Sequence, residues 1–120
     1  MVMKPLKKTH TSIVIPAEVK IDGYVFKVTA IADKAFRGNK KLKKAIIGKN
    51  IVKIGKESFS GCRKLKNITV NSSKLKSVGK NAFKNIPAKA KIKAPKKKLA
   101  AYKKYLKKAK LDKKVKVIKK

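Results

Sequence analysis

The sequence predicts a single α/β repeat domain: a short solenoid with a parallel sheet, an N-terminal β-hairpin and a C-terminal capping helix. Three observations support this fold class. Apolar residues recur every 23 or 24 positions, the chain of 120 residues suits one small domain, and its two ends depart from the repeat. The hydrophobic content of 42% is high enough for a buried core, so a wholly disordered chain is not expected.

The repeat appears when consecutive segments are aligned. The units are residues 28–50, 51–73 and 74–94. Phe36, Phe59 and Phe83 share one position in these units. The other aligned sets are Ile31 with Ile54 and Val78, Leu42 with Leu65, Gly38 with Gly61, Asn39 with Cys62 and Ile86, and Ile68 with Ile92. A unit this short cannot bury a core alone, so like residues are expected to stack into buried ladders between units.

Each unit is expected to contribute one strand to the parallel sheet. The strands are predicted over residues 42–47, 65–70 and 89–94. The stretches 33–38 and 56–61, which contain phenylalanine, predict short helical turns. Each turn ends on a glycine, which adopts positive φ without steric cost.

The N-terminal part precedes the first full unit. Residues 1–10 are predicted to form a flexible basic tail, and residues 11–94 the repeat region. Within that region, residues 11–27 predict a strand followed by a hairpin, because the sequence alternates around the strong turn signal Asp22-Gly23. This end is expected to be the less well closed of the two.

Residues 95–120 are predicted to form a C-terminal cap, with a helix over 96–110 and a strand over 114–118. The apolar residues of the helix fall on one face: Leu99, Tyr102, Leu106 and Ala109. Tyr102 is accordingly expected to face the core. The helix is expected to cover the last repeat and shield its exposed edge.

The second unit allows comparison with a known repeat. From Ile54 to Val70 the sequence reads IGKESFSGCRKLKNITV, and VGKNAF at 78–83 repeats its first half. This pattern resembles the BspA-type leucine-rich repeat, I-G-x-x-A-F-x-x-C-x-x-L-x-x-I-x-I, over residues 12–120. The departures are Ser58 for Ala, Asn39 for Cys, Ala45 for a strand Ile, and an eroded third unit. The resemblance implies a leucine-rich-repeat solenoid.

The charge is strongly unbalanced, because 37 lysines and arginines face only 5 acidic residues, a formal net charge of +32. Such a field attracts polyanions in general, so non-specific polyanion binding in vitro is expected. All but two of the basic residues are lysines, however, and specific reading of phosphate and guanine favours arginine. The composition therefore does not predict a dedicated nucleic-acid reader.

No catalytic, cofactor or metal site is predicted. Cys62 is the single cysteine and aligns with repeat core positions, so it is expected to be a buried small hydrophobe. His10 is the single histidine and lies in the tail, so the chain has too few ligands for a zinc set. The five carboxylates are dispersed along the sequence, and no glycine-rich phosphate loop occurs.

Strand alternation predicts a candidate ligand face. If Ile68 and Val70 point into the core, Asn67 and Thr69 point out, and equivalent positions follow in the other strands. The predicted face is Val14, Lys44, Ile46, Asn67, Thr69, Lys91 and Lys93. The alternative, a solvated sheet face without a ligand, stays open at this point.

Three functions are compatible with these observations. The resemblance implies a non-enzymatic adhesion module of a bacterial cell-surface or secreted protein that binds a protein or matrix ligand. The charge favours a polyanion binder, for nucleic acid or an acidic cell-wall polymer, and a structural C-terminal capping fragment of a longer array is the third. No apolar run predicts a membrane span, and the N-terminal residues show no signal peptide. Ligand identity and oligomeric state are not predicted.

Overall fold

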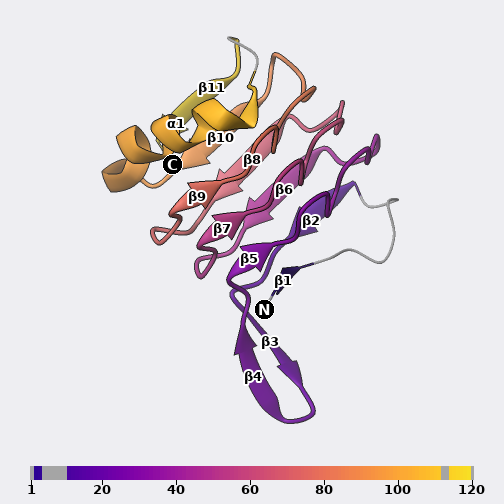
Figure 1. The fold of residues 1–120 in the computed structure, drawn as a ribbon, viewed down its shortest axis with the longest axis vertical. Coiled ribbons are helices and arrows are strands. Elements are labelled where there is room, and N and C mark those ends of the chain that lie inside the picture. The colour runs from indigo at the N-terminus through magenta and orange to yellow at the C-terminus, as the bar shows by residue number, and fades with distance from the viewer. Residues whose placement is uncertain (1, 4–10, 112–113, 120) are drawn as a thin grey trace.

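The body of the protein consists of two sheets of parallel strands, and the strands of each sheet follow one another along one axis (Figure 1). The structure is a computed structural model that describes residues 2–3, 11–111 and 114–119. A hairpin projects from one end of the body, and a helix lies across the other. This arrangement confirms the predicted α/β repeat solenoid.

The long sheet has five strands, and every neighbouring pair is parallel. In spatial order they are β2 (Ser12–Val14), β6 (Lys44–Ile47), β8 (Asn67–Val70), β10 (Lys91–Ala94) and β11 (Lys116–Lys119). The pairing keeps one core row in register: Ile13, Ala45, Ile68, Ile92 and Val117. This row is inside because Ala45, Ile68 and Ile92 are fully buried.

A second, short sheet runs beside the first and was not predicted as a sheet. Its strands are β1 (Val2–Met3), β5 (Ala30–Ile31), β7 (Lys53–Ile54) and β9 (Ser77–Val78), all parallel. Ile31, Ile54 and Val78, the predicted ladder, are buried in this sheet.

Two residues of the predicted N-terminal tail belong to a sheet. Val2 and Met3 pair in parallel with Ala30 and Ile31, so these two residues form an edge strand of the short sheet and not part of a free tail. The reason is that β5 would otherwise present unpaired backbone groups on that side. Residues 4–10, the rest of the predicted tail, lie outside the described part of the chain.

A column of stacked phenylalanines fills the core between units. The ring centroids of Phe36 and Phe59 lie 5.1 Å apart, and those of Phe59 and Phe83 lie 5.3 Å apart, with interplanar angles of 12° and 6°. All three side chains are buried. The column confirms that the units stack with like residue on like residue.

The phenylalanine stretches form hydrogen-bonded turns, not helices. In the first of these stretches, the Arg37 N–H donates to the Lys34 carbonyl and closes a turn. Gly38 and Gly61 adopt φ values of 73° and 78°, as predicted. A regular helix does not form because alternate amides donate to the next unit: the Phe36 N–H donates to the Ser58 carbonyl at 2.7 Å.

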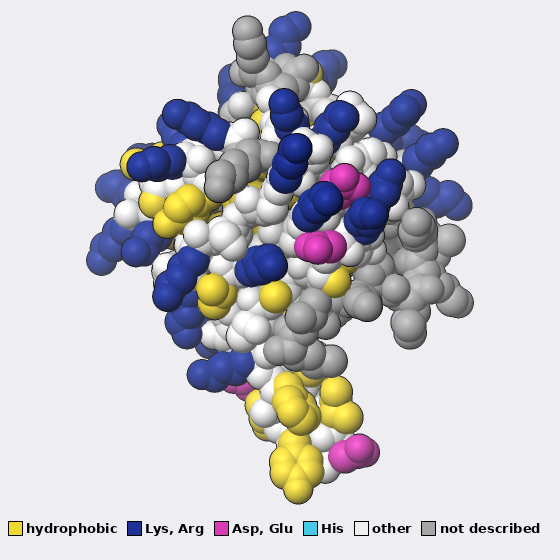
Figure 2. Space-filling view, in the orientation of Figure 1, with side chains coloured by type: hydrophobic (Ala, Val, Ile, Leu, Met, Phe, Trp, Pro, Cys, Tyr) yellow, Lys and Arg dark blue, Asp and Glu magenta, His cyan; other side chains and the backbone are white. Residues whose placement is uncertain are grey.

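The hairpin consists of β3 (Glu18–Ile21) and β4 (Tyr24–Lys27), joined at Asp22-Gly23, where both residues have positive φ. Cross-strand pairs Val19–Phe26 and Ile21–Tyr24 give it one apolar face. Figure 2 shows these apolar side chains gathered on the projecting arm, and Tyr24 is 71% exposed. One face of the hairpin is therefore apolar, whereas the surface of the body carries many lysines.

The C-terminal cap departs from one continuous helix over 96–110. It contains η1 (Lys96–Lys98), α1 (Leu99–Leu106) and η2 (Lys107–Ala109), in which the two η segments are 3₁₀ turns. Lysines occupy both ends of α1, no acidic residue lies in its first turn, and no side chain caps its N-terminus. The like charges and uncapped amides shorten the α-helix.

The predicted role of the cap is only half correct. Helix α1 contacts β9, at the end of the short sheet, and β11. The long sheet continues one strand further, through β11, and the helix does not pair with its outer edge. Ala109 continues the ladder of the turns, since its carbonyl accepts from the Phe83 N–H at 3.1 Å. The cap therefore acts partly as a degenerate fourth unit.

Tyr102 fastens this cap to the repeats. Its side chain is only 1% exposed, as predicted for the core-facing position. The hydroxyl donates to the Ser72 carbonyl at 2.7 Å and accepts from the Leu75 N–H at 3.2 Å. Burial raises the pKa of this hydroxyl above its usual value of about 10.

We expect Tyr102→Phe to lower the free energy of unfolding by about 1–3 kcal/mol, because two buried backbone groups lose their partner. The loss should depend on pH. The raised pKa favours the neutral hydroxyl in the folded protein, so the contribution is complete below about pH 10 and declines as the pH rises further. Urea unfolding of both proteins from pH 7 to 11 tests this. A difference that grows above pH 10 would contradict it.

Close approach between units depends on glycine. An ideal Cβ at Gly55 would lie 2.5 Å from the Ile31 carbonyl oxygen and 2.6 Å from the Asp33 nitrogen of the preceding unit. At Gly79, the next equivalent position, it would lie 2.4 Å from the Lys56 nitrogen. Both obstacles are backbone, so they cannot swing aside as a side chain would. The equivalent residue of the first unit is Ala32.

We expect Gly55→Ala to lower the free energy of unfolding by roughly 3 kcal/mol, since the added methyl group forces two units apart. Ala32→Gly is the matched control: it makes the reverse change at the equivalent position and should cost about 1 kcal/mol or less. Urea unfolding measures both. Equal effects of the two substitutions would show that unit spacing does not require the glycine.

Candidate functional site

Side chains on the solvent side of the long sheet fall into two rows that cross all five strands. Strand alternation places them opposite the buried core row. The first row is Ser12, Lys44, Asn67, Lys91 and Lys116, and the second is Val14, Ile46, Thr69, Lys93 and Ile118. These ten residues are called the outer face.

All seven residues of the predicted ligand face lie on this surface. Lys44, Asn67, Lys91 and Lys93 are exposed, and Ile46 and Thr69 are half-buried between their neighbours. Val14 is 62% exposed, which is unusual for an aliphatic side chain on a strand. The geometry groups these residues on one surface; a ligand for that surface stays a prediction.

Three residues of the outer face, Ser12, Lys116 and Ile118, are absent from the predicted ligand face. Lys116 and Ile118 belong to β11, which the sequence places over 114–118 and the structure over Lys116–Lys119. Their register with Lys91 and Lys93 extends both rows by one strand. The alternation of Lys116, Val117 and Ile118 carried this signal, because the middle residue continues the core row.

Charge is unevenly distributed over the outer face. Its N-terminal strands present Val14 and Ile46 with one lysine, Lys44, whereas its C-terminal strands present Lys91, Lys93 and Lys116 with one apolar residue, Ile118. No acidic residue occupies either row. Lys91 and Lys116 sit on adjacent strands, so their backbones are only about 4.8 Å apart. An acidic group laid there would meet several cations at once.

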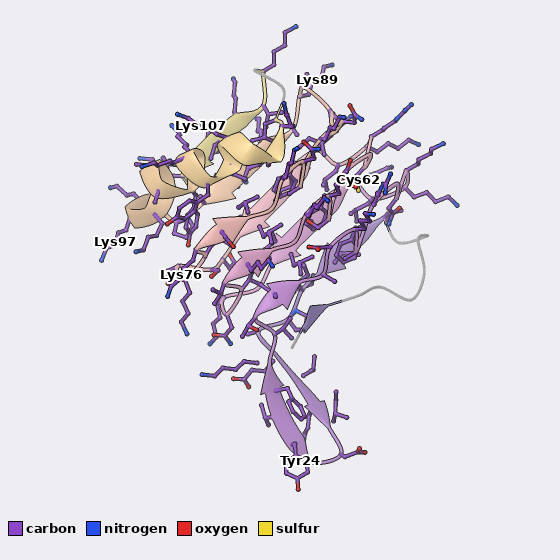
Figure 3. The ribbon with its side chains drawn as sticks, in the orientation of Figure 1. Tyr24, Cys62, Lys76, Lys89, Lys97 and Lys107 are labelled. Atoms are coloured by element: carbon purple, nitrogen blue, oxygen red, sulfur yellow. The ribbon has the colours of Figure 1, made fainter. Side chains whose placement is uncertain are left out.

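Two shallow hollows adjoin Asn67. One, of about 200 Å³, is lined by Lys44, Asn67, Ile68, Thr69, Lys91 and Lys93. The other, of about 420 Å³, is lined by Lys43, Lys64, Lys66 and Asn67, where the strands begin. Lysines also surround the rest of the body: Lys76, Lys89, Lys97 and Lys107 project from its rim in Figure 3. The hollows are open and basic, and suit an extended acidic surface more than an enclosed small molecule.

The remaining reactive groups are used structurally. Cys62 is fully buried, as expected, and its thiol donates to the Phe36 carbonyl at 3.1 Å. The Asp33 carboxylate accepts from the Lys56 N–H at 2.8 Å, and Glu57 pairs with Arg37 at 3.4 Å. These contacts join neighbouring units. His10 lies outside the described residues.

Among residues 2–3, 11–111 and 114–119, no three His, Cys, Asp or Glu side chains come close enough to hold a metal ion. No helix in the same part of the chain has the length and apolar character needed to cross a bilayer.

The repeat matches a known family. The BspA type Leucine rich repeat region matches residues 29–120, in six copies. No curated protein sequence matches the chain significantly.

Solved bacterial structures are similar to the chain. A leucine rich cell surface protein from Faecalibacterium prausnitzii is 30% identical with a TM-score of 0.61, over 70% of this chain and 23% of its own. The T. pallidum Leucine Rich Repeat protein is 29% identical with a TM-score of 0.61, over 74% and 39%. A leucine-rich repeat protein from Bacteroides ovatus, at 23% identity and a TM-score of 0.53, over 68% and 29%, supports the fold alone.

The chain thus spans well under half the length of each of these proteins. The family match covers most of the chain. The repeated residues of this match form the stacked phenylalanines, the paired strands and the close contacts at the glycines. This family is generally a non-catalytic binding fold. The chain belongs to the BspA-type leucine-rich repeat family.

Proposed function

We propose that this chain is a non-enzymatic binding module of a bacterial cell-surface or secreted protein. In this proposal it recognises a protein or matrix ligand through the outer face of the long sheet. The observation that supports it is the in-register grouping of apolar Val14 and Ile46 beside the lysines of the C-terminal strands. Solenoids commonly bind through such a continuous strand surface. The resemblance to a cell surface protein supports the setting.

The ligand chemistry follows from the division of the face. Apolar groups of the ligand would cover Val14 and Ile46, and acidic groups would lie over Lys91, Lys93 and Lys116. The remaining lysines would steer an acidic partner toward the molecule from a distance, which raises the association rate more than the affinity. Thr69 lies between the two regions and would be covered by either.

We expect the double variant Ile46→Glu and Thr69→Glu to abolish binding to an immobilised extracellular-matrix preparation. The two carboxylates would add charge to the apolar centre and neutralise the adjacent lysines. Lys53→Glu is the matched control, because it also changes the net charge by two and lies exposed on β7 of the short sheet. Binding by the control and none by the double variant supports the outer face. Equal binding by both would exclude it.

A polyanion is the second candidate ligand, favoured by the absence of acidic residues from the outer face and by its two basic hollows. In this function a nucleic acid or an acidic cell-wall polymer would lie across the strands and displace counterions as its charges meet the lysines.

For this candidate, affinity for a 20-bp DNA duplex should fall steeply with salt. Replacing Lys44, Lys91 and Lys93 together with Gln should lower the slope of log K against log salt by roughly 3, if each contacts one phosphate. The triple variant Lys96→Gln, Lys97→Gln and Lys98→Gln removes the same charge from exposed positions before α1. Titrations from 50 to 500 mM salt compare them. Equal slopes for both triples would show diffuse attraction without a site.

A further inference from the structure

The outer edge of β11 is unpaired in the described part of the chain. β11 is the last strand of the long sheet, and its only neighbour there is β10. The Lys116 N–H donates to the Ala90 carbonyl at 3.2 Å, so the backbone groups of Lys116 point toward β10. In a parallel ladder the next residue points the other way, so the N–H and C=O of Val117 face outward.

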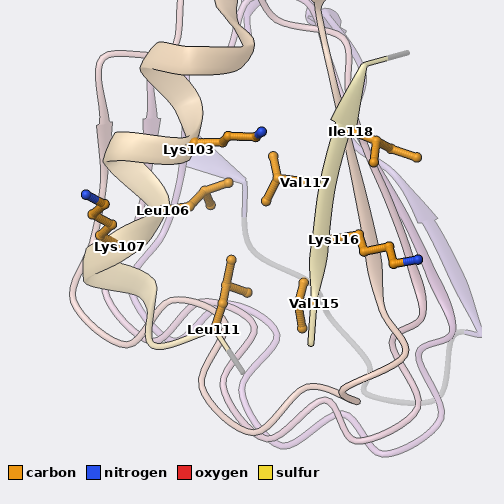
Figure 4. Close-up of a pocket in the computed structure, with 8 residues that line it drawn as sticks. All are labelled: Lys103, Leu106, Lys107, Leu111, Val115, Lys116, Val117 and Ile118. Atoms are coloured by element: carbon orange, nitrogen blue, oxygen red, sulfur yellow. The ribbon is translucent and has the colours of Figure 1, made fainter. Parts of the chain in front are cut away.

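An apolar groove runs beside this edge, between α1 and β11 (Figure 4). Its apolar lining toward the helix is Leu106, Leu111, Val115 and Val117, and its volume is about 570 Å³. Val117 is the fifth member of the core row, after Ile92, but it is only half-buried, whereas Ile92 is fully buried. The core row thus ends against open space that one further inward-facing side chain would fill.

Basic side chains surround the groove. Lys103 extends from the helix toward β11, Lys107 projects from the helix away from β11, and Lys116 projects from the far side of β11 (Figure 4). None of the eight residues that line the groove is acidic. The site therefore combines a free strand edge, an apolar channel and a cationic rim.

We propose that this edge is a strand-acceptor site, which binds an extended acidic segment of another protein whose residues alternate apolar and acidic. The segment pairs with β11 as a sixth strand. Its apolar side chains enter the groove beside Val117, on the side of Lys103, and its acidic side chains lie on the opposite face of the new strand, beside Lys116. Main-chain hydrogen bonds supply affinity, and the groove and lysines supply selectivity.

Charge selects this occupant over a second copy of the chain. Each copy has a formal net charge of +32, so stacking two bodies edge to edge brings lysine against lysine. Lysines on an edge strand also discourage self-pairing in natural sheets. The same lysines attract an acidic strand instead of repelling it. The site overlaps the outer face only at Lys116 and Ile118, which end the two rows and also line the groove.

Fluorescein-labelled peptides test the proposal by anisotropy with the full chain in 150 mM salt. The probe is EVELEVE, and we expect it to bind. A scrambled peptide of equal composition, EEVLVEE, should bind at least tenfold more weakly because it loses the alternation. An EVELEVE peptide N-methylated at its leucine and at the following glutamate should also bind at least tenfold more weakly, because one of these two adjacent amides faces β11 in either strand direction. The cationic peptide KVKLKVK should not bind.

Val117→Pro tests the edge itself. Proline removes an N–H that faces away from β10 and places its ring on the outer edge, where edge strands tolerate it. We expect EVELEVE to bind this variant at least tenfold more weakly. The double variant Ile46→Glu and Thr69→Glu should bind EVELEVE as Lys53→Glu does, which separates this site from the outer face. The N-methylated peptide on the unaltered protein gives the same test if Val117→Pro does not fold.

Two results would overturn the proposal. Equal binding of EVELEVE, its N-methylated form and EEVLVEE would show attraction to charge alone. Light scattering that detects dimers of the unaltered chain, but not of Val117→Pro, would make a second copy the occupant.

Discussion

The body of this structure depends on the close approach of one repeat unit to the next. The backbones of neighbouring units come so near at Gly55 and Gly79 that a methyl group would overlap the preceding chain. That distance allows the amides of one turn to donate to the carbonyls of the next and brings the phenylalanine rings within 5.1 and 5.3 Å. A unit of about 23 residues has no core of its own, so the contacts between units are its core.

The same stacking explains how a chain with so many lysines remains folded. Lysines fall at positions that point away from the axis, while buried positions recur at the repeat interval and are mostly apolar, the exceptions being Asn39, Asn50, Ser58 and Ser72. Repulsion among the cations is therefore spread over the surface, where water and salt screen it. Two of the five carboxylates join units, in the Arg37–Glu57 pair and the Asp33 contact to Lys56. In each unit, the buried residues that stabilise the fold are therefore separate from the surface lysines that carry the charge.

Stacking also fixes where binding surfaces arise. Repetition in register turns single outward residues into rows, and this makes the outer face one continuous surface. It equally creates an edge wherever the repetition stops. At the C-terminal end the helix contacts the short sheet at β9, and among the described residues the last strand of the long sheet is β11, whose core residue Val117 is half-buried. The proposed recognition face and the proposed strand-acceptor site are therefore both consequences of one repeat geometry.

The repeat period, the phenylalanine column, the hairpin turn and the burial of Cys62 and Tyr102 were all predictable from the sequence. Each rests on local spacing or on like residues recurring at one interval, which a linear pattern records directly. The pairing of Val2–Met3 with β5, the second sheet, the break of the cap into three segments and the open edge of β11 were not. Two-residue strands carry too few alternating positions to be recognised, and pairing partners lie more than 20 residues apart. Which edge a helix covers depends on the packing of whole elements against each other, and residues such as Lys116 and Ile118 join the outer face only after that packing places β11 beside β10.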